Sequence, residues 1–453
     1  MDSLEPIVAC FAAQAPACDY WTLRLVEESS DHLAVRQGVV EPSALGASLG
    51  AMVTVVAGGG VGYGATSDLS AEGLRAAADQ ALGWAQAHAR LGLFDGAIYP
   101  RTALRADYRS PVAEPWEALS LQDKLGLLQA VNRALAIDAR IVDWSAWLAH
   151  RQVRQLLVTS DGARIDQVWT YVSPGLVAVA NQGSQTQRRH GGGADWSQQG
   201  GLERIAAAGL IEDAPRVAEE AIALLSAPEC PQDTRDLILT PSQMVLQIHE
   251  SIGHPLELDR ILGDERNYAG TSFVTPEMFG TYRYGSELLN VTFDPGVPGE
   301  LVSCAADDEG TPARREYLIR GGLLERPLGG RLSQSRAGLP GTANARACAW
   351  DRPAIDRMAN INLEPGEGTL ADLIARVERG ILMDTNRSWS IDDSRNKFQF
   401  GCELGRLIED GALKGLVRNP GYRGISAEFW RSLAGVGGAE TLEVRGVQNC
   451  GKG

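Results

Sequence analysis

Helix-forming and strand-forming segments are segregated along this chain, and this segregation constrains its fold more than any other feature. A strand-rich run at 45–67 precedes a helical segment at 70–91, and from about residue 234 the sequence is mostly strands and Gly/Pro-rich loops. A doubly wound sheet needs strands and helices that alternate. The pattern therefore predicts an α+β fold.

We expect three units. They are a smaller N-terminal α/β domain over 1–95, a middle α/β segment over 110–230, and a large, mostly antiparallel β-rich C-terminal domain over 234–453. The chain has 453 residues and a hydrophobic content of 44 %, so it can bury sizeable cores.

The middle unit has clear local signals. Its first helix begins at Ser120 and carries Asp123 in its first turn. A hairpin follows over 153–172, and Asp161-Gly162 is expected to supply the positive φ angles of its turn.

Charge and segment composition exclude several protein classes. The net charge of −15 repels phosphate backbones and anionic lipids, so we expect no nucleic-acid partner and no membrane partner. The N-terminus is acidic where a signal peptide is basic, and no run of about 18 apolar residues occurs. We expect a cytoplasmic protein whose seven scattered cysteines are reduced thiols.

The segment HESIGHPLELD, residues 249–259, is the strongest chemical signal. It resembles the zinc-protease pattern H-E-x-x-H with one extra residue, so that His249 and His254 are five apart. An ideal helix would place their side chains about 140° apart instead of about 40°.

The expected ends of the helix that carries this segment explain how the two histidines could still meet. Thr240 is the expected N-cap, Pro241 the first helical residue, and Gln243 the partner in a capping box. Gly253 is suited to a left-handed C-cap, and Pro255 disfavours the α conformation at His254. If the helix unwinds at Gly253 or contains a π-bulge there, His254 can approach His249.

Two histidines leave a catalytic zinc site one protein ligand short. The candidates for the third ligand are Glu257, Asp259 and Cys450, the last of which lies in a glycine loop. Glu250 is next to a ligand and is placed to act as a general base on the metal-bound water.

Three further motifs allow both a functional and a structural interpretation. Tyr422 and Arg423 could bind a peptide backbone, or they could belong to a structural turn. The acidic stretch 307–309 could line the site, or it could be a solvated turn. The segment 60–65 nearly matches a dinucleotide-binding loop but lacks the acidic residue that should follow, so a β-turn is the better interpretation.

Taken together, the motifs resemble those of catalytic, D-type members of the TldD/PmbA family, the modulators of DNA gyrase. The resemblance covers most of the chain and rests on HESIGHPLELD and on four later motifs in the order of the family: DDEGTPARREYLIRGGLL, RMANINLEPG, NPGYRG and CGKG. Relatives usually continue past the last of these, whereas this chain stops at Gly453, where fraying is expected.

The resemblance implies a zinc metallopeptidase that hydrolyses unfolded peptides or small proteins. It implies zinc ligands His249, His254 and Cys450, with Glu250 catalytic. It also implies a homodimer, or a heterodimer with an E-type (PmbA-like) subunit. The alternative is a non-catalytic regulatory or scaffold protein that binds a partner subunit or peptide without hydrolysis.

Overall fold

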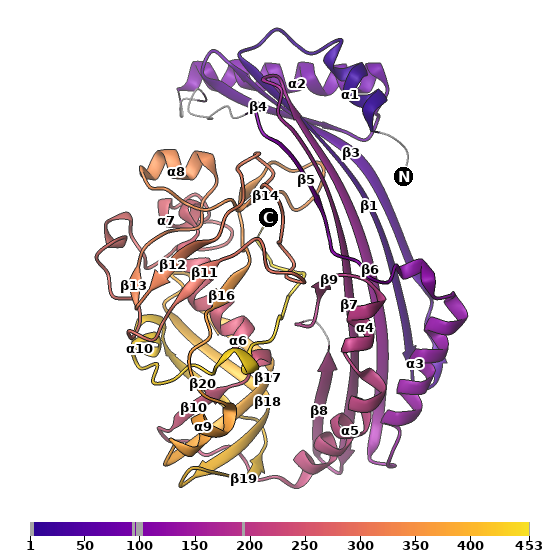
Figure 1. Ribbon diagram of the computed structural model, residues 1–453, viewed down its shortest axis with the longest axis vertical. Coiled ribbons are helices and arrows are strands. Elements are labelled where there is room, and N and C mark those ends of the chain that lie inside the picture. The colour runs from indigo at the N-terminus through magenta and orange to yellow at the C-terminus, as the bar shows by residue number, and fades with distance from the viewer. Residues whose placement is uncertain (1–3, 93–95, 97–102, 193–194, 453) are drawn as a thin grey trace.

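The computed structural model describes residues 4–92, 96, 103–192 and 195–452. It confirms an α+β fold with mostly antiparallel sheets. Within the described ranges, only two strand pairs run parallel: β5 (Arg105–Arg109) with β7 (Arg164–Gln182), and β10 (Asp236–Leu239) with β17 (Arg379–Ile391). Figure 1 shows a long curved sheet on one side of the molecule and the C-terminal strands on the other.

The long sheet combines strands from both the N-terminal and the middle unit. Its order is β4-β3-β1-β6-β7-β5, with β2 paired to β1 and with β8 and β9 paired to β7. Its other strands are β1 (Tyr20–Arg36), β2 (Val39–Val40), β3 (Ala44–Ala57), β4 (Gly60–Thr66), β6 (Ile141–Thr159), β8 (Gln185–Gly192) and β9 (Gln198–Gln199). The two expected units therefore share one sheet, and the domain boundaries stay a prediction.

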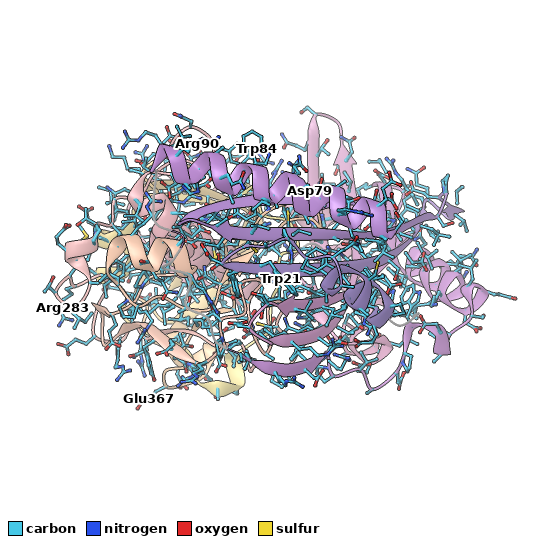
Figure 2. The ribbon with its side chains drawn as sticks, turned by 90° about the horizontal axis from the view of Figure 1, so that it is seen from above. Trp21, Asp79, Trp84, Arg90, Arg283 and Glu367 are labelled. Carbon is cyan, nitrogen blue, oxygen red and sulfur yellow. The ribbon has the colours of Figure 1, made fainter. Side chains whose placement is uncertain are left out.

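Helices α1 (Glu5–Ala12) and α2 (Ala71–Leu91) cover one end of this sheet, where Figure 2 shows α2 with Asp79, Trp84 and Arg90 alongside the strands. A Cβ at Gly60, Gly62 or Gly64 would lie 2.0 Å from a carbonyl oxygen of α2. Glycine thus lets β4 lie directly against the helix backbone. β3 and β4 form a hairpin whose turn is at Gly58-Gly59, so the β-turn lies just before residues 60–65, which themselves belong to β4.

Helices α3 (Leu121–Leu135) and α5 (Leu210–Ser226) share a second core with β1, β6 and β7, and the short α4 (Leu202–Ala207) precedes α5. The start of α3 is as predicted, because Ser120 and Asp123 form a reciprocal capping box.

The prediction for the β6–β7 turn is half right. Gly162 has a φ of +93°, but Asp161 is not among the residues with positive φ. The Thr159 amide donates to the Ala163 carbonyl, and the Gly162 amide donates to the Thr159 carbonyl. This bulged turn needs only one left-handed residue.

The C-terminal part contains three smaller sheets. Their orders are β10-β17-β18-β19 with β20 on β18, β13-β12-β11-β16, and β14-β15. The strands are β11 (Val291–Phe293), β12 (Glu316–Arg320), β13 (Leu323–Leu324), β14 (Ala345–Arg346), β15 (Ile355–Asp356), β16 (Ile361–Leu363), β18 (Lys397–Glu409), β19 (Ala412–Val417) and β20 (Gly421–Ile425). The helices are α6 (Pro241–Ile248), α7 (Leu258–Leu262), α8 (Arg331–Ala337), α9 (Leu370–Ala375) and α10 (Ser426–Arg431).

A buried acidic turn joins the long sheet to the C-terminal part. Asp308 accepts hydrogen bonds from Arg24 at 2.9 Å and from Gln155 at 2.8 Å, while Asp307 accepts from the Thr311 amide at 2.8 Å. Both interpretations of the acidic stretch are therefore wrong: it neither lines the candidate site nor faces solvent. No helix in the described part of the chain is long and apolar enough to span a membrane.

Candidate metal centre

Helix α6 begins as predicted, with Thr240 as N-cap and Pro241 as the first residue. The predicted capping box is wrong. The Thr240 hydroxyl donates to Asp384 at 2.6 Å, and the Gln243 side chain donates to the Tyr422 hydroxyl at 2.9 Å. The Thr240 amide donates to the Met383 carbonyl, and the Gln243 side-chain oxygen accepts from Asn386 and Cys402, so the groups that a capping box would use are bound elsewhere.

The extra residue between the histidines is accommodated by a π turn, His249–Gly253, followed by a 3₁₀ turn, His254–Leu256. The His254 amide donates to the His249 carbonyl, five residues earlier. Hydrogen bonding at this interval brings residues five apart onto one side of the helix. The π-bulge alternative is therefore the one that forms.

The predicted conformations of Gly253 and His254 are wrong, because both are right-handed helical. Glycine at 253 has another physical reason. A Cβ there would lie 2.3 Å from the Met358 sulfur and 2.9 Å from Ile361 Cδ1. A side chain at 253 would therefore require Met358 and Ile361 to move.

Buried polar groups support the irregular turn. The Tyr284 hydroxyl donates to the Ser251 carbonyl, and Trp430 Nε1 donates to the Ser251 hydroxyl at 2.9 Å. Ile252 and Leu256 are fully buried in the adjoining hydrophobic core. The position of His254 is thus fixed by tertiary packing.

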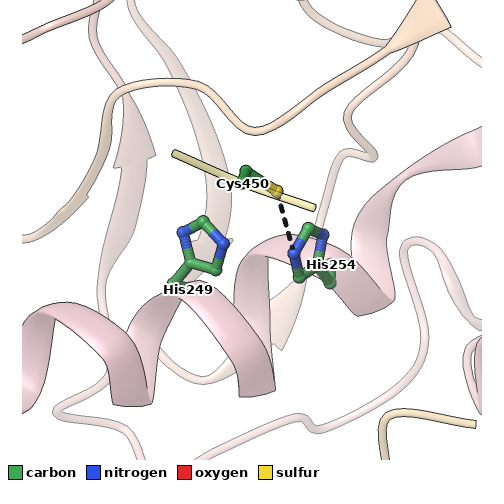
Figure 3. A group of neighbouring side chains, drawn as sticks. All are labelled: His249, His254 and Cys450. Carbon is green, nitrogen blue, oxygen red and sulfur yellow. Dashed lines mark hydrogen bonds between the residues drawn. The ribbon is translucent and has the colours of Figure 1, made fainter. Parts of the chain in front are cut away.

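His249, His254 and Cys450 converge in space, although Cys450 lies almost 200 residues further along the chain. Their ligand atoms all lie within 4.8 Å of one another. Cys450 Sγ is 3.5 Å from His254 Nε2 (Figure 3), and the two imidazole rings meet edge to face at a centroid distance of 4.6 Å.

Glu257 and Asp259 are outside this group of potential ligands. Glu257 Oε2 is instead 3.0 Å from His254 Nδ1, and Arg260 donates to the same oxygen at 3.1 Å. Asp259 accepts from Lys452. A carboxylate on Nδ1 fixes the ring and leaves Nε2 toward Cys450, which is the usual support of a metal-binding histidine.

The electrostatics favour an ionised thiol. Burial raises the pKa of the Cys450 thiol, but hydrogen bonds from His249 and His254 and their positive charge outweigh it and hold the pKa at about 5. Burial lowers the pKa of His254, but the charges of Glu257 and Cys450 and the hydrogen bonds to both residues together outweigh it and raise the pKa to about 9. A thiolate is the form of cysteine that binds metals.

The donor set fits a zinc ion. Zinc takes nitrogen at about 2.0 Å and sulfur at about 2.3 Å in a tetrahedral arrangement, so such ligands lie about 3.5 Å apart. The sulfur–nitrogen distance of 3.5 Å between Cys450 and His254 agrees with this value. Three protein ligands leave a fourth position, as in catalytic zinc sites.

Glu250 lies on the same π turn and is buried, with its carboxylate 2.9 Å from Arg395 Nη1. Arg395 also donates to the Ala269 carbonyl at 2.9 Å and has a φ of +61°. Sequence reasoning missed Arg395, because no local signal in the β17–β18 turn connects it to a residue 145 positions earlier.

Tyr422 lies beneath α6. Its hydroxyl accepts from Gln243 and donates to Gln247, both at 2.9 Å, and its ring stacks on Phe400. Arg423, the next residue on β20, is exposed. This environment agrees with the structural interpretation of the motif for Tyr422, and a substrate contact by either residue stays a prediction.

A cavity adjoins the three convergent side chains. Its walls include His249 and Cys450, residues 357–362 before and along β16, and Arg151 and Tyr171 from the long sheet. The candidate metal centre therefore opens on a space between the long sheet and the C-terminal part.

Family comparisons cover most of the chain. Three models match: PmbA/TldA metallopeptidase domain 1 at residues 21–85, the central domain at 114–227 and the C-terminal domain at 232–451. A metalloprotease from Methanothermobacter thermautotrophicus is 28 % identical over 73 % of this chain and 69 % of its own length. A metalloprotease from Synechocystis is 26 % identical over 100 % of this chain and 93 % of its own length.

Solved structures have the same fold. A protein described as a modulator of a DNA gyrase from Thermotoga maritima aligns with a TM-score of 0.78 at 17 % identity, over 96 % of this chain and 95 % of that chain. TldE from Thermococcus kodakarensis aligns with a TM-score of 0.70 at 17 % identity, over 96 % and 94 %.

Proposed function

Because this chain belongs to the PmbA/TldD metallopeptidase family, we propose that it is a zinc-dependent peptidase that hydrolyses unfolded peptides or small proteins. One observation carries the proposal: two imidazoles and a thiol converge within 4.8 Å, beside a buried glutamate on the same π turn. The metalloprotease names of the relatives agree with it.

In this proposal His249, His254 and Cys450 hold the metal. When bound there, a zinc ion would supply Lewis acidity to the peptide carbonyl and to the attacking water. Glu250 accepts the proton of the attacking water and passes it to the leaving amine. Arg395 holds the Glu250 carboxylate in place for both transfers.

Substrate binding as an added β-strand is consistent with the cavity wall. Strand β16 is the outermost strand of the sheet β13-β12-β11-β16, and Ile361 and Asn362 line the cavity. A peptide on that edge is held through main-chain hydrogen bonds, which depend little on the sequence of the peptide. Broad specificity for unfolded chains follows, since a folded substrate offers no free strand.

We also propose that the chain works as a dimer, with a second copy or with an E-type subunit. Apolar side chains are exposed along β2 and β3, with Val39 at 67 % and Leu45 at 79 % exposure. Such a surface is suited to a protein partner. Light scattering of the chain alone and after co-expression with an E-type subunit measures the assembly.

Glu250→Gln tests the catalytic proposal. The variant keeps the volume of the side chain and should keep zinc, while cleavage of an unfolded test peptide falls by about 100-fold or more, because the general base is lost. Full cleavage by zinc-loaded Glu250→Gln would refute the mechanism. Peptide binding without cleavage by the zinc-loaded wild type would favour the non-catalytic alternative.

A further inference from the structure

The cavity beside the metal centre carries an excess of positive charge. Among the described residues that line it, Glu300 is the only acid. Four of the lining residues are arginines: Arg151, Arg346, Arg357 and Arg445. The whole chain has a net charge of −15, so this concentration of cations is local. It calls for either counterions within the protein or an anionic ligand.

Two of the four arginines have counterions within the protein. Arg151 pairs with Glu28 at 2.7 Å. Arg445 pairs with Asp195 at 3.4 Å and with Glu443 at 2.5 Å. These side chains need no ligand to balance their charge.

Arg346 and Arg357 have no carboxylate within ion-pair distance in the described part of the chain. Arg346 donates to the Met358 carbonyl, and Arg357 donates to the Cys450 carbonyl at 3.4 Å. The Nε atom of each guanidinium is buried without a partner. Burial and the charge of Arg357 lower the pKa of Arg346, against the weaker opposing charges of Tyr171, Asp308 and Cys304.

A short strand ladder holds the pair. Arg346 lies on β14 opposite Ile355 of β15, and the Arg357 amide donates to the Asn344 carbonyl at 3.2 Å. The Asn344 side chain returns a hydrogen bond to the Arg357 carbonyl at 2.8 Å. The backbone at Arg346 and at Arg357 is therefore held by hydrogen bonds within the protein, without any ligand.

We infer that Arg346 and Arg357 form a subsite that binds a carboxylate group of the peptide substrate next to the metal centre. The planar donor forks of two arginines match a carboxylate, and desolvation in the cavity strengthens the contact. Contact between Arg357 and the backbone of Cys450 puts the subsite next to one of the three candidate metal ligands. The inference rests on the proposed peptidase function and adds a substrate preference to it.

Two sources can supply the carboxylate: the free C-terminus of the peptide, or an Asp or Glu side chain near the cleaved bond. Three matched unfolded peptides separate the two sources. The first has no Asp or Glu and ends in a free carboxylate, and the second is its C-terminal amide. The third is the same amide with its internal Gln residues replaced by Glu. We expect kcat/KM of the wild type to be about 10- to 100-fold higher for one carboxylate peptide than for the neutral amide.

Arg346→Gln should abolish this preference by raising KM for the carboxylate peptide, while zinc content and cleavage of the neutral amide stay near the wild-type values. Arg151→Gln is the matched control in the same cavity. Since Glu28 already neutralises Arg151, that variant should keep the preference. Equal loss in both variants would overturn the assignment to Arg346 and Arg357.

Binding separates failure of this inference from failure of the proposed function. Anisotropy of the same peptides, labelled with a fluorophore, is measured on zinc-loaded Glu250→Gln, so no cleavage is needed. Tighter binding of a carboxylate peptide that disappears with Arg346→Gln supports the subsite even if the wild type hydrolyses nothing. Equal affinity for all three peptides overturns the subsite, even if the wild type cleaves them all.

Discussion

The ammonium group of Lys452 lies 2.7 and 2.8 Å from the two carboxylate oxygens of Asp259, and both side chains are buried. The same ammonium is 3.3 Å from Glu257, the carboxylate that holds His254. One lysine thus ties the segment that carries Cys450 to the carboxylate that contacts His254. Fraying was expected this close to Gly453, and the buried contacts of Lys452 with Asp259 and the Asp356 carbonyl oppose it.

Lys452→Met should loosen Cys450 and leave buried carboxylates without their cation. We expect a metal affinity about 10- to 100-fold weaker, and a loss of about 3–5 kcal/mol in the free energy of unfolding. Competition with a zinc chelator and urea unfolding measure the two effects. Lys414→Met is the matched control, since Lys414 is exposed on β19 and should tolerate the change.

Gly253→Ala should disturb the π turn, because the added methyl group would meet the Met358 sulfur at 2.3 Å. We expect a cost of about 1–3 kcal/mol in the free energy of unfolding, together with weaker metal binding. Gly83→Ala adds the same methyl group to the exposed face of α2, where nothing lies within 4 Å, and should stabilise by about 0.5–1 kcal/mol. Equal stability of the two variants would contradict the close packing at Gly253.

Arg395→Gln should lower peptidase turnover without lowering zinc content, because Arg395 positions Glu250 and is outside the group of potential metal ligands. We expect a fall of about 10-fold or more in kcat, with KM nearly unchanged. Steady-state kinetics measures kcat and KM, and metal analysis of the same preparation measures the zinc content. Unchanged turnover would show that the ion pair does not serve the reaction.

Glu300 predicts a pH dependence of stability. Burial, with the nearby charges of Asp294 and Glu364, raises its pKa to about 8, against the pull of the hydrogen bond from Asn362. The folded state holds the proton more tightly than the unfolded state, so the stabilisation is present at low pH and is lost as pH rises from about 4 to about 8.

Glu300→Gln removes that loss, because the amide does not ionise. We expect similar melting temperatures for the variant and the wild type at pH 5, and a variant higher by about 2 °C or more at pH 9. If the melting temperatures of the variant and the wild type differ by the same amount at pH 5 and pH 9, Glu300 is already ionised in the folded protein at pH 5.

Sequence reasoning succeeded where local patterns decide the structure. The helix expected from Ser120 begins there, and a π-bulge was one of two proposed ways to bring His254 to His249. Cys450 was one of three open candidates from composition alone. The family resemblance singled it out, because spacing cannot bring residues 254 and 450 together.

The failures come from contacts between distant segments. The Thr240 amide binds the Met383 carbonyl and the Gln243 oxygen binds Asn386, so the capping box does not form. Gly253 packs directly against the end of the Met358 side chain, although the residue has an ordinary helical φ. The partners Arg395 and Glu250 have no pattern in common in the sequence. Such pairs become visible only when the strands that carry them are placed side by side.

Zinc stoichiometry tests the central claim most directly. Elemental analysis of the chain purified without chelator should give about one zinc per wild-type chain, and about one tenth or less for His254→Ala and Cys450→Ser at unchanged folding. Less than about half an equivalent in the wild type, or full zinc retention in Cys450→Ser, would contradict a metal centre built from His249, His254 and Cys450.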